Sequence, residues 1–346
     1  MNSSYWTCAL CHRQIPHGAD RYNCTVCKDH DECETCAKYL QIKHPHRLVR
    51  ELAYGSPEIN VRTGPSMAES LHAVMNMYSD RHCLGIRNTD SYTWLKYKKV
   101  YKRVQNFANG LRTLVKSRES IGICAANRPE WIIADLACLL SSFISVPIYN
   151  KMSDRDMTFV INNTKISSII CDKETLPKFI ELCSQCSSLH RIICMDSLSQ
   201  VNQTDNIRFY EMQDIEKKGS SGNFHLIPTK PSDCLTIINT SGSTDVPKGA
   251  ILSDQAFRAI FPDPLPNIRE SILLHYQPLA WYGGRNSMLY QFFFGGRIAF
   301  SSGNIDQLME EIALVRPTIF GAPPNIWNKI YSEFKGALAL KLAETK

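Results

Sequence analysis

Beyond residue 66 the apolar residues follow two spacings that alternate along the chain. Between residues 94 and 115 they recur at steps of three and four, which predicts a helix over 94–115. The short apolar run Ile121–Cys124 that follows is typical of a buried strand. Asn127 then stands where a helix cap would, and Pro129 suits the first turn of the next helix.

The same alternation continues toward the C-terminus. Strands are predicted at 146–148, 167–171, 191–194, 235–238, 250–252, 297–300 and 318–320, and helices at 154–162, 175–186 and 305–315. Strands that alternate with helices favour parallel pairing through crossover connections. We therefore expect an α/β domain with a largely parallel sheet over residues 67–346. His275, on an apolar run, is expected in the core or at its edge.

Turn-forming residues separate this domain from a different N-terminal region. Residues 54–66 are rich in glycine, proline and serine, so we place a linker at 51–66 and a separate small domain at 1–50. The run 131–149 is apolar but contains Asp135, three serines and Pro147. It therefore predicts a buried helix and strand rather than a membrane span.

Six cysteines and two histidines stand at regular intervals in the N-terminal domain. The set is Cys8, Cys11, Cys24, Cys27, Cys33, Cys36, His44 and His46. Two thiolates at Cys-x2-Cys spacing can bind one metal ion across a tight turn. So short a segment buries too little apolar surface to fold alone, and zinc supplies about 10–16 kcal/mol per structural site. These residues predict two zinc ions.

A disulfide framework is the alternative interpretation of the cysteines. The first residues, Met1–Trp6, show neither the basic nor the apolar part of a secretory signal. Eight further cysteines are scattered through the rest of the chain, as is typical of reduced thiols in the cytoplasm. The two histidines also favour zinc. We expect a cytoplasmic protein and leave open contact with the cytosolic face of the endoplasmic reticulum or another membrane.

The intervals, together with Pro16, Gly18 and the segment Cys27–Cys33, resemble the ZZ-type zinc finger. The resemblance implies a small zinc-stapled α+β finger in which Cys8, Cys11, Cys33 and Cys36 bind one zinc, and Cys24, Cys27, His44 and His46 the other. It also implies a partner, a protein N-terminus or peptide, bound by Asp29 and Asp31. Ala9 and Leu10 stand where a third acid is common. The alternative is that both aspartates are solvated or cap a turn.

Composition and net charge exclude few classes of binding partner. The chain of 346 residues is 44% hydrophobic and carries a formal charge of +6 without a dense basic block. This balance does not call for nucleic acid, and we expect none as a partner. It supports at most a weak attraction to nucleotides or to the surface of an anionic membrane.

The loop Asn239–Gly249 carries the most distinctive chemistry of the larger domain. It places four hydroxyl residues and one glycine, Thr240 to Thr244, after a predicted strand, and Pro247 and Lys248 follow. Backbone N–H groups in such a turn can bind an anion, and the Lys248 ammonium suits a terminal phosphate. A P-loop differs, since its lysine is followed by serine or threonine at the start of a helix. A polar surface turn is the alternative.

The segment Thr240–Gly249 resembles the phosphate loop of the adenylate-forming enzymes, with Asp245 in place of a glycine and Asn239 in place of a tyrosine. The resemblance implies ATP, Mg²⁺ and CoA as cofactors. It implies that Lys248 and Thr244 act in catalysis by neutralising the phosphates. The cofactor-binding residues that it implies are Thr240, Ser241, Gly242, Ser243, Thr244, Lys248 and Gly249.

Other segments are similar to the long-chain fatty acid–CoA ligases within that superfamily. They are Tyr92–Tyr97, Asn127–Trp131, Val146–Tyr149, Pro231–Asp233, Pro278–Ala280 and Arg316–Phe320. Trp281 replaces the family's histidine near the acyl pocket, where an aromatic ring could form a wall or gate; the alternative is a tryptophan of the core. Asn325 replaces an arginine. The resemblance implies a long-chain fatty acid as substrate.

Two functions remain open. The first is a ligase that converts a fatty acid to acyl-adenylate and then to acyl-CoA, with the finger recruiting a protein. The family's later adenine, ribose and lid motifs do not occur in these 346 residues, so we expect an incomplete adenylation N-terminal domain that does not complete catalysis alone. The second is a non-catalytic, zinc-dependent peptide-binding module with a degenerate nucleotide-binding half.

Overall fold

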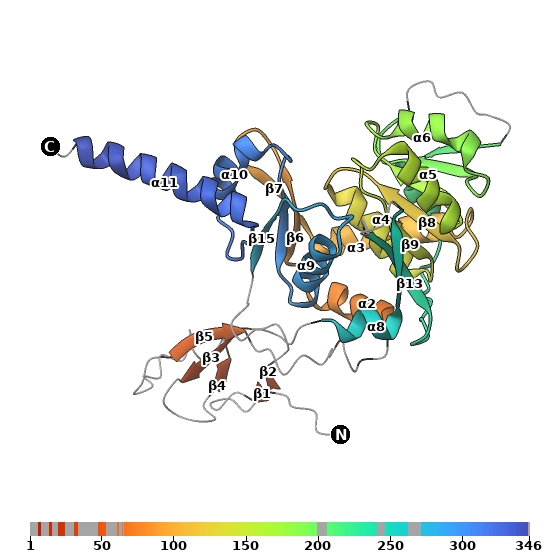
Figure 1. Ribbon diagram of the computed structural model, residues 1–346. Coiled ribbons are helices and arrows are strands. Elements are labelled where there is room, and N and C mark those ends of the chain that lie inside the picture. The colour runs from red at the N-terminus through yellow and green to blue at the C-terminus, as the bar shows by residue number, and fades with distance from the viewer. Residues whose placement is uncertain are drawn as a thin grey trace. The chain divides into compact units, whose positions relative to one another are not determined.

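The computed structural model describes most of the larger domain and short parts of the N-terminal region (Figure 1). The described residues are 61, 64, 66–198, 206–240, 246–261 and 271–344, with the segments 6–7, 14–15, 20–24, 31–33 and 48–52. The chain divides into two compact units, Met1–Gly64 and Pro65–Lys346. Each unit is described here by itself.

The first unit contains two small antiparallel sheets. Strand β1 (Trp6–Thr7) pairs with β2 (Gln14–Ile15). Strand β3 (Asp20–Cys24) lies between β4 (Asp31–Cys33) and β5 (Leu48–Leu52). The register places Arg21 opposite Cys33 and Cys24 opposite Leu48.

A seven-stranded sheet forms the centre of the second unit, in the order β12-β11-β10-β8-β9-β13-β14. Its strands are β8 (Ser120–Cys124), β9 (Ile144–Pro147), β10 (Ile166–Cys171), β11 (Arg191–Cys194), β12 (Arg208–Glu211), β13 (Cys234–Thr240) and β14 (Lys248–Ser253). All neighbouring pairs are parallel except β13–β14. Every residue of β8 and β10 is buried, as expected of a parallel sheet covered on both faces.

Helices cover both faces of this sheet (Figure 1). Helices α5 (Asp154–Asn163) and α6 (Leu176–Leu182) share an apolar cluster with β10, β11 and β12, in which Phe179 and Ile169 are fully buried. Helix α3 (Tyr97–Leu111) contacts both α4 (Pro129–Leu140) and α7 (Met212–Gly219). The unit also contains α2 (Met67–Met77), α8 (Asp254–Ala259) and the 3-10 turn Cys183–Gln185. The predicted α/β domain with a largely parallel sheet is confirmed.

A second sheet of four strands, in the order β15-β16-β6-β7, was not predicted as a separate layer. Strands β15 (Ile272–His275), β16 (Arg297–Phe300) and β6 (His82–Arg87) are parallel, and β7 (Tyr92–Lys96) returns antiparallel to β6. Helix α9 (Tyr282–Phe293) lies between the two sheets (Figure 1). The remaining elements are the 3-10 turn Ile305–Gln307, α10 (Leu308–Val315) and α11 (Pro324–Glu344).

Tertiary pairing changed several predicted boundaries. The predicted helix 94–115 begins only at Tyr97, because residues 92–96 pair with β6 and place Trp94 opposite Gly85. A Cβ at Gly85 would lie 3.0 Å from the Trp94 ring, so the strand pair needs this glycine. The helices predicted at 175–186 and 305–315 are each shortened by a 3-10 turn. The strand predicted at 318–320 is a single bridge between Leu273 and Ile319.

Three smaller observations concern the cysteines, His275 and membrane spans. The eight cysteines beyond the N-terminal region are free, and most are buried, as expected for reduced thiols. His275 is 3% exposed, which confirms its expected place in the core. Among the described helices, none combines the length and the apolar character that a bilayer span requires.

Candidate functional site

The loop predicted to bind phosphate joins the only antiparallel pair of the large sheet. Thr240 ends β13 and Lys248 begins β14, and the two residues lie directly opposite each other. The Thr240 hydroxyl donates to the Lys248 carbonyl oxygen at 3.4 Å. Directly opposite residues of an antiparallel pair project from the same face, so the hydroxyl and the ammonium can approach one ligand. Both side chains are exposed.

Of the other residues predicted to bind phosphate in this loop, the structure describes only Gly249. Gly249 lies opposite Asn239, and a Cβ there would approach Ile237 at 2.9 Å. Ser241, Gly242, Ser243 and Thr244 lie outside the described residues. The structure therefore places Thr240 and Lys248, on either side of the predicted phosphate-binding turn, beside each other.

A buried ion pair holds the strand that leads into this loop. Arg285 of α9 is 1% exposed and donates to both carboxylate oxygens of Asp135 in α4, at 2.8 and 2.7 Å. The guanidinium also donates to the Thr236 hydroxyl of β13 at 2.6 Å and to the Ser145 hydroxyl of β9 at 2.9 Å. Because these groups satisfy one another in a water-excluded place, they fix α9 against the large sheet. Arg285 was missed in the sequence, since nothing local links it to Asp135.

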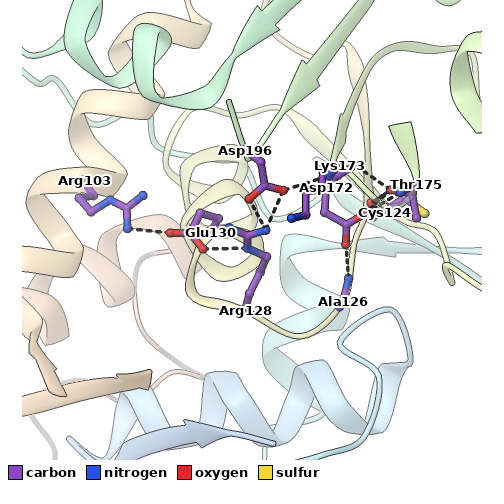
Figure 2. Close-up of polar contacts among 9 residues, drawn as sticks. All are labelled: Arg103, Cys124, Ala126, Arg128, Glu130, Asp172, Lys173, Thr175 and Asp196. Carbon is purple, nitrogen blue, oxygen red and sulfur yellow. Dashed lines mark hydrogen bonds and ion pairs between the residues drawn. The ribbon is translucent and has the colours of Figure 1, made fainter. Parts of the chain in front are cut away.

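The turn after β8 is held by a second polar network, which Figure 2 shows. The Arg128 guanidinium donates to Glu130 at 2.9 Å and to Asp196 at 3.0 Å, and Arg103 donates to Glu130 at 3.1 Å. Burial by itself raises the pKa of Glu130, but the Arg128 hydrogen bond and the two positive charges outweigh it, so the pKa is lowered. Asp172 accepts from the Ala126 amide at 2.8 Å. These contacts set the start of α4.

Asn127, in the same turn, does not cap α4 as predicted. The cap position is Arg128, which makes no side-chain capping bond. The Asn127 side chain instead donates to the Gln277 carbonyl oxygen at 2.7 Å and accepts from the Leu279 amide at 2.9 Å. It therefore joins the large sheet to the segment that follows β15. This long-range role is the physical reason that the cap prediction was wrong.

A cavity of about 400 Å³ opens where β15 ends, near α9. Its walls include Leu273, Leu274, His275, Asn286, Tyr290 and Ile319. In α/β sheets, ligands bind at the carboxyl ends of parallel strands, and this volume suits a small molecule. Burial lowers the pKa of His275 to about 4, so its imidazole is neutral near pH 7. Its Nε2 has no hydrogen-bond partner among the described residues.

Trp281 precedes α9 and is 52% exposed, so the alternative of a core tryptophan is wrong. Its ring centroid lies 5.5 Å from that of Tyr149, which follows β9. The two aromatic rings, tilted by 48° to each other, thus bring together the segment after β9 of the large sheet and the segment before α9. The same helix α9 contributes Asn286 and Tyr290 to the cavity wall.

The predicted zinc and peptide residues fall mostly outside the described part of the chain. Cys24 and Cys33 end β3 and β4, and Asp31 begins β4. Cys8, Cys11, Cys27, Cys36, His44, His46 and Asp29 lie outside the described residues. Within the described residues, no group of three or more histidine, cysteine and acidic side chains is arranged to hold a metal ion.

The family model for the AMP-binding enzymes matches residues 71–345. The chain belongs to this family. The match spans nearly the whole second unit, including the β13–β14 loop and the cavity beside α9. It confirms the adenylate-forming resemblance that the loop Thr240–Gly249 indicated.

Curated relatives narrow the comparison. Fatty acyl-CoA synthetase A of Dictyostelium discoideum is 30% identical over 277 residues, which are 75% of this chain and 41% of the relative. Long-chain-fatty-acid--CoA ligase 6 of Rattus norvegicus is 32% identical over 271 residues, 72% of this chain and 39% of the relative. The similarity to long-chain fatty acid–CoA ligases is confirmed. The chain spans about two fifths of the length of these relatives.

Solved structures agree on the fold. The A domain of the carboxylic acid reductase from Segniliparus rugosus, in complex with AMP and a co-purified carboxylic acid, superimposes with a TM-score of 0.71 at 18% identity. The alignment covers 82% of this chain and 53% of that one. A long-chain-fatty-acid-CoA ligase from Archaeoglobus fulgidus gives a TM-score of 0.65 at 15% identity, covering 82% and 55%.

Proposed function

We propose that this chain provides the N-terminal part of an enzyme that activates a long-chain fatty acid with ATP. The acid would form an acyl-adenylate and pyrophosphate, and the acyl group would then pass to CoA. The observation that carries this proposal is the placement of Thr240 beside Lys248 in a member of the AMP-binding family. The named relatives support the choice of a fatty acid.

Each end of the proposed phosphate site has a distinct task. The exposed Lys248 ammonium offsets negative charge on the β- and γ-phosphates, and the Thr240 hydroxyl would turn from the Lys248 carbonyl oxygen to donate its hydrogen bond to the ligand. Thr244 and the other loop residues, Ser241, Gly242 and Ser243, complete the set in this proposal. Mg²⁺, when bound, neutralises the remaining phosphate charge. The buried Arg285–Asp135 pair keeps β13 in place while the loop binds its ligand.

The cavity at the end of β15 is the proposed site for the acid. Leu273, Leu274 and Ile319 offer apolar contacts for an acyl chain, and the neutral imidazole of His275 adds no charge. Trp281, before the helix that lines this cavity, is the proposed wall on the side of Tyr149. Asn127 would hold the 277–279 segment between the phosphate loop and the acid.

Nucleotide binding and exchange test this proposal at two levels. Calorimetry should detect ATP binding to the 346-residue chain, with Lys248→Ala weakening it. Exchange of labelled pyrophosphate into ATP, measured with and without a long-chain acid, should depend on the acid if this part suffices for adenylation. The proposal is wrong if ATP produces no heat and exchange is absent even when the remaining family segments are supplied.

We further propose that two zinc ions fold the first unit, with the ligand pairing that the ZZ resemblance implies. The backbone register supports separate centres for Cys24 and Cys33. Arg21 lies opposite Cys33, and Cys24 is three residues further along β3. Three residues of strand span about 10 Å. Thiolates on one zinc lie within about 4.6 Å of each other, since each Zn–S bond is about 2.3 Å.

Elemental analysis of the purified protein tests the zinc assignment. Two zinc ions per chain are expected, and Cys24→Ser should reduce the content as strongly as Cys33→Ser. A metal-free protein with N-terminal disulfides by mass spectrometry would support the disulfide framework instead. A zinc content of one per chain would contradict the two-centre arrangement.

A peptide-binding module is the second candidate function, favoured by the acids in the first unit. Asp31 begins β4 opposite Asn23, and Asp29 precedes it in the sequence. Their carboxylates would pair with the α-ammonium of a protein N-terminus. Titration with peptides that have free or acetylated N-termini should show a preference for the free amine. Unchanged affinity in the Asp29→Ala, Asp31→Ala double variant would remove this site.

A further inference from the structure

A second cavity, of about 390 Å³, lies at the opposite edge of the four-stranded sheet. Strands β6 and β16 begin there, with His82 and Arg297, and the antiparallel β7 ends there with Lys96. The carboxyl end of β15, where His275 and the proposed acid cavity lie, is at the other edge because β15 and β16 are parallel. The lining residues are Asp80, Arg81, His82, Lys96, Gly295 and Arg297.

Two of the lining arginines are stacked on aromatic rings. The Arg297 guanidinium carbon lies 4.9 Å from the ring centroid of Trp94, and that of Arg81 lies 4.8 Å from the centroid of Tyr78. In such a contact the aromatic ring covers the flat face of the guanidinium group. The N–H donors lie in the plane of the group and point outward. The Nε of Arg297 is buried and has no hydrogen-bond partner among the described residues. The stacked Arg297 is thus oriented before any ligand arrives.

Gly295 makes the close approach of Arg81 possible. Its backbone has a φ of +64°, in the left-handed region that glycine adopts readily. A Cβ at this position would lie 2.8 Å from the Tyr78 ring and 2.9 Å from Nη1 of Arg81. Any larger residue would therefore push the guanidinium away from the ring. The cavity depends on this glycine for its shape.

The charges around the cavity are unbalanced in favour of anions. Arg81, Lys96 and Arg297 are cationic, and Asp80 is the one acid in the lining. The carboxylate of Asp80 accepts from the Lys98 ammonium at 2.8 Å and lies 3.9 Å from that of Lys96. The Lys98 hydrogen bond and charge, with a smaller effect of the Lys96 charge, lower the pKa of Asp80, so this acid offsets only part of the positive charge of the lining.

We propose that this cavity binds the phosphate group of a small phosphorylated molecule. Planar guanidinium groups pair with phosphate oxygens through two parallel hydrogen bonds, and Lys96 adds a point charge. The cavity exceeds the size of a phosphate ion, so the rest of the molecule, whether a soluble organic phosphate or a phospholipid headgroup, fits beside it. The site is independent of the β13–β14 loop and does not rest on the proposed ligase activity.

Calorimetric titration with glycerol 3-phosphate, and co-sedimentation with vesicles containing phosphatidic acid, test the proposal on the whole chain. Arg297→Gln should weaken binding about tenfold, because one charged hydrogen-bonding partner is lost. The affinity of Arg297→Lys should lie between those of the wild type and Arg297→Gln, since lysine keeps the charge but not the paired donors. Lys96→Gln, at an exposed position, provides a second variant if Arg297→Gln does not fold.

Two matched controls make the outcome decisive. Arg155→Gln removes the same charge from an exposed position of α5 and should leave binding unchanged. Lys248→Gln should also leave it unchanged, whereas it should weaken ATP binding. Binding of the soluble phosphate, or of the vesicles alone, supports the site and identifies its source. Absence of binding to either, an equal loss with Arg155→Gln, or a loss with Lys248→Gln would overturn the proposal.

Discussion

The two sheets of the second unit are assembled in different ways. Strands β8 to β11 of the large sheet follow one another with helices between them, and β8 and β10 are buried throughout. The small sheet joins residues 82–96 to residues 272–300, and its β7 is only partly buried. Strands that are joined by short connections pair at a low entropic cost, whereas the small sheet must bring together segments that are distant in the sequence. The positions of its strand ends therefore depend on tertiary contacts, and the two cavities described above lie at those strand ends.

Removing the contact between α9 and the large sheet should have the largest effect. Arg285→Met leaves the Asp135 carboxylate buried without its partner, so the free energy of unfolding should fall by about 3–5 kcal/mol. Urea unfolding followed by circular dichroism measures this loss. The double variant Arg285→Met, Asp135→Leu should recover most of it, because no unpaired charge remains. Equal stability of the single variant and the wild type would show that the pair is not what holds α9 against the large sheet.

Adding one methyl group at each of two glycines compares how tightly α3 packs against α7 with how tightly the small sheet is packed. Gly110 of α3 would place a Cβ 2.2 Å from the Ile215 carbonyl oxygen, so Gly110→Ala should cost about 3 kcal/mol. Gly85→Ala in the small sheet meets the Trp94 ring at 3.0 Å and should cost about 1 kcal/mol. Thermal denaturation of both variants measures the difference. The reverse order would mean that the small sheet is the less tolerant of the two.

The pH dependence of the free energy of unfolding should reflect the titration of His275, the last residue of β15 in the small sheet. His275 has a folded pKa of about 4 against an ordinary value of 6.5, so the unfolded chain binds the proton first as pH falls. Stability is therefore lost between about pH 6.5 and 4, and His275 should account for about 2 kcal/mol between pH 7.5 and 5. His275→Phe should flatten this slope in urea titrations. The exposed His190→Phe should not, and an identical slope in all three proteins would contradict the assignment.

The smallest effect is expected at the antiparallel end of the large sheet. Lys248 is exposed, so Lys248→Ala should leave the free energy of unfolding unchanged. It should weaken ATP binding by about 1.5 kcal/mol, the lower range for a hydrogen bond to a charged group. Calorimetry measures the affinity, and Lys230→Ala, at another exposed lysine of this unit, is the control. Similar losses in both variants would indicate only a change in overall charge.

Local pattern predicted much of the large sheet, while the phosphate-binding role of the loop between β13 and β14 stays a prediction. The strand Arg191–Cys194 and the helix beginning at Asp154 lie where their spacing placed them. Thr240 and Lys248 were recognised because hydroxyl, glycine and lysine residues gather in one short segment. The zinc ligands and the peptide-binding acids, recognised in the same way, remain predictions.

Roles that depend on a distant partner could not be predicted. Asn127 follows a strand and precedes a helix, which is the place of a cap, yet its hydrogen bonds go to Gln277 and Leu279. Trp94 continues the spacing of the helix behind it, but its pairing with Gly85 holds it in a strand. In both cases a contact across the fold outweighs the local preference.

The order of residues by itself determined which segments are helical or extended, and it predicted where a phosphate-binding turn would stand, because these follow from spacing and from the chemistry of neighbours. Only the tertiary structure decided that Arg285 meets Asp135, that residues 82–96 pair with residues 272–300, and that two stacked arginines surround one cavity. These contacts join residues far apart in the chain, and their energies exist only after the surrounding elements have packed and excluded water.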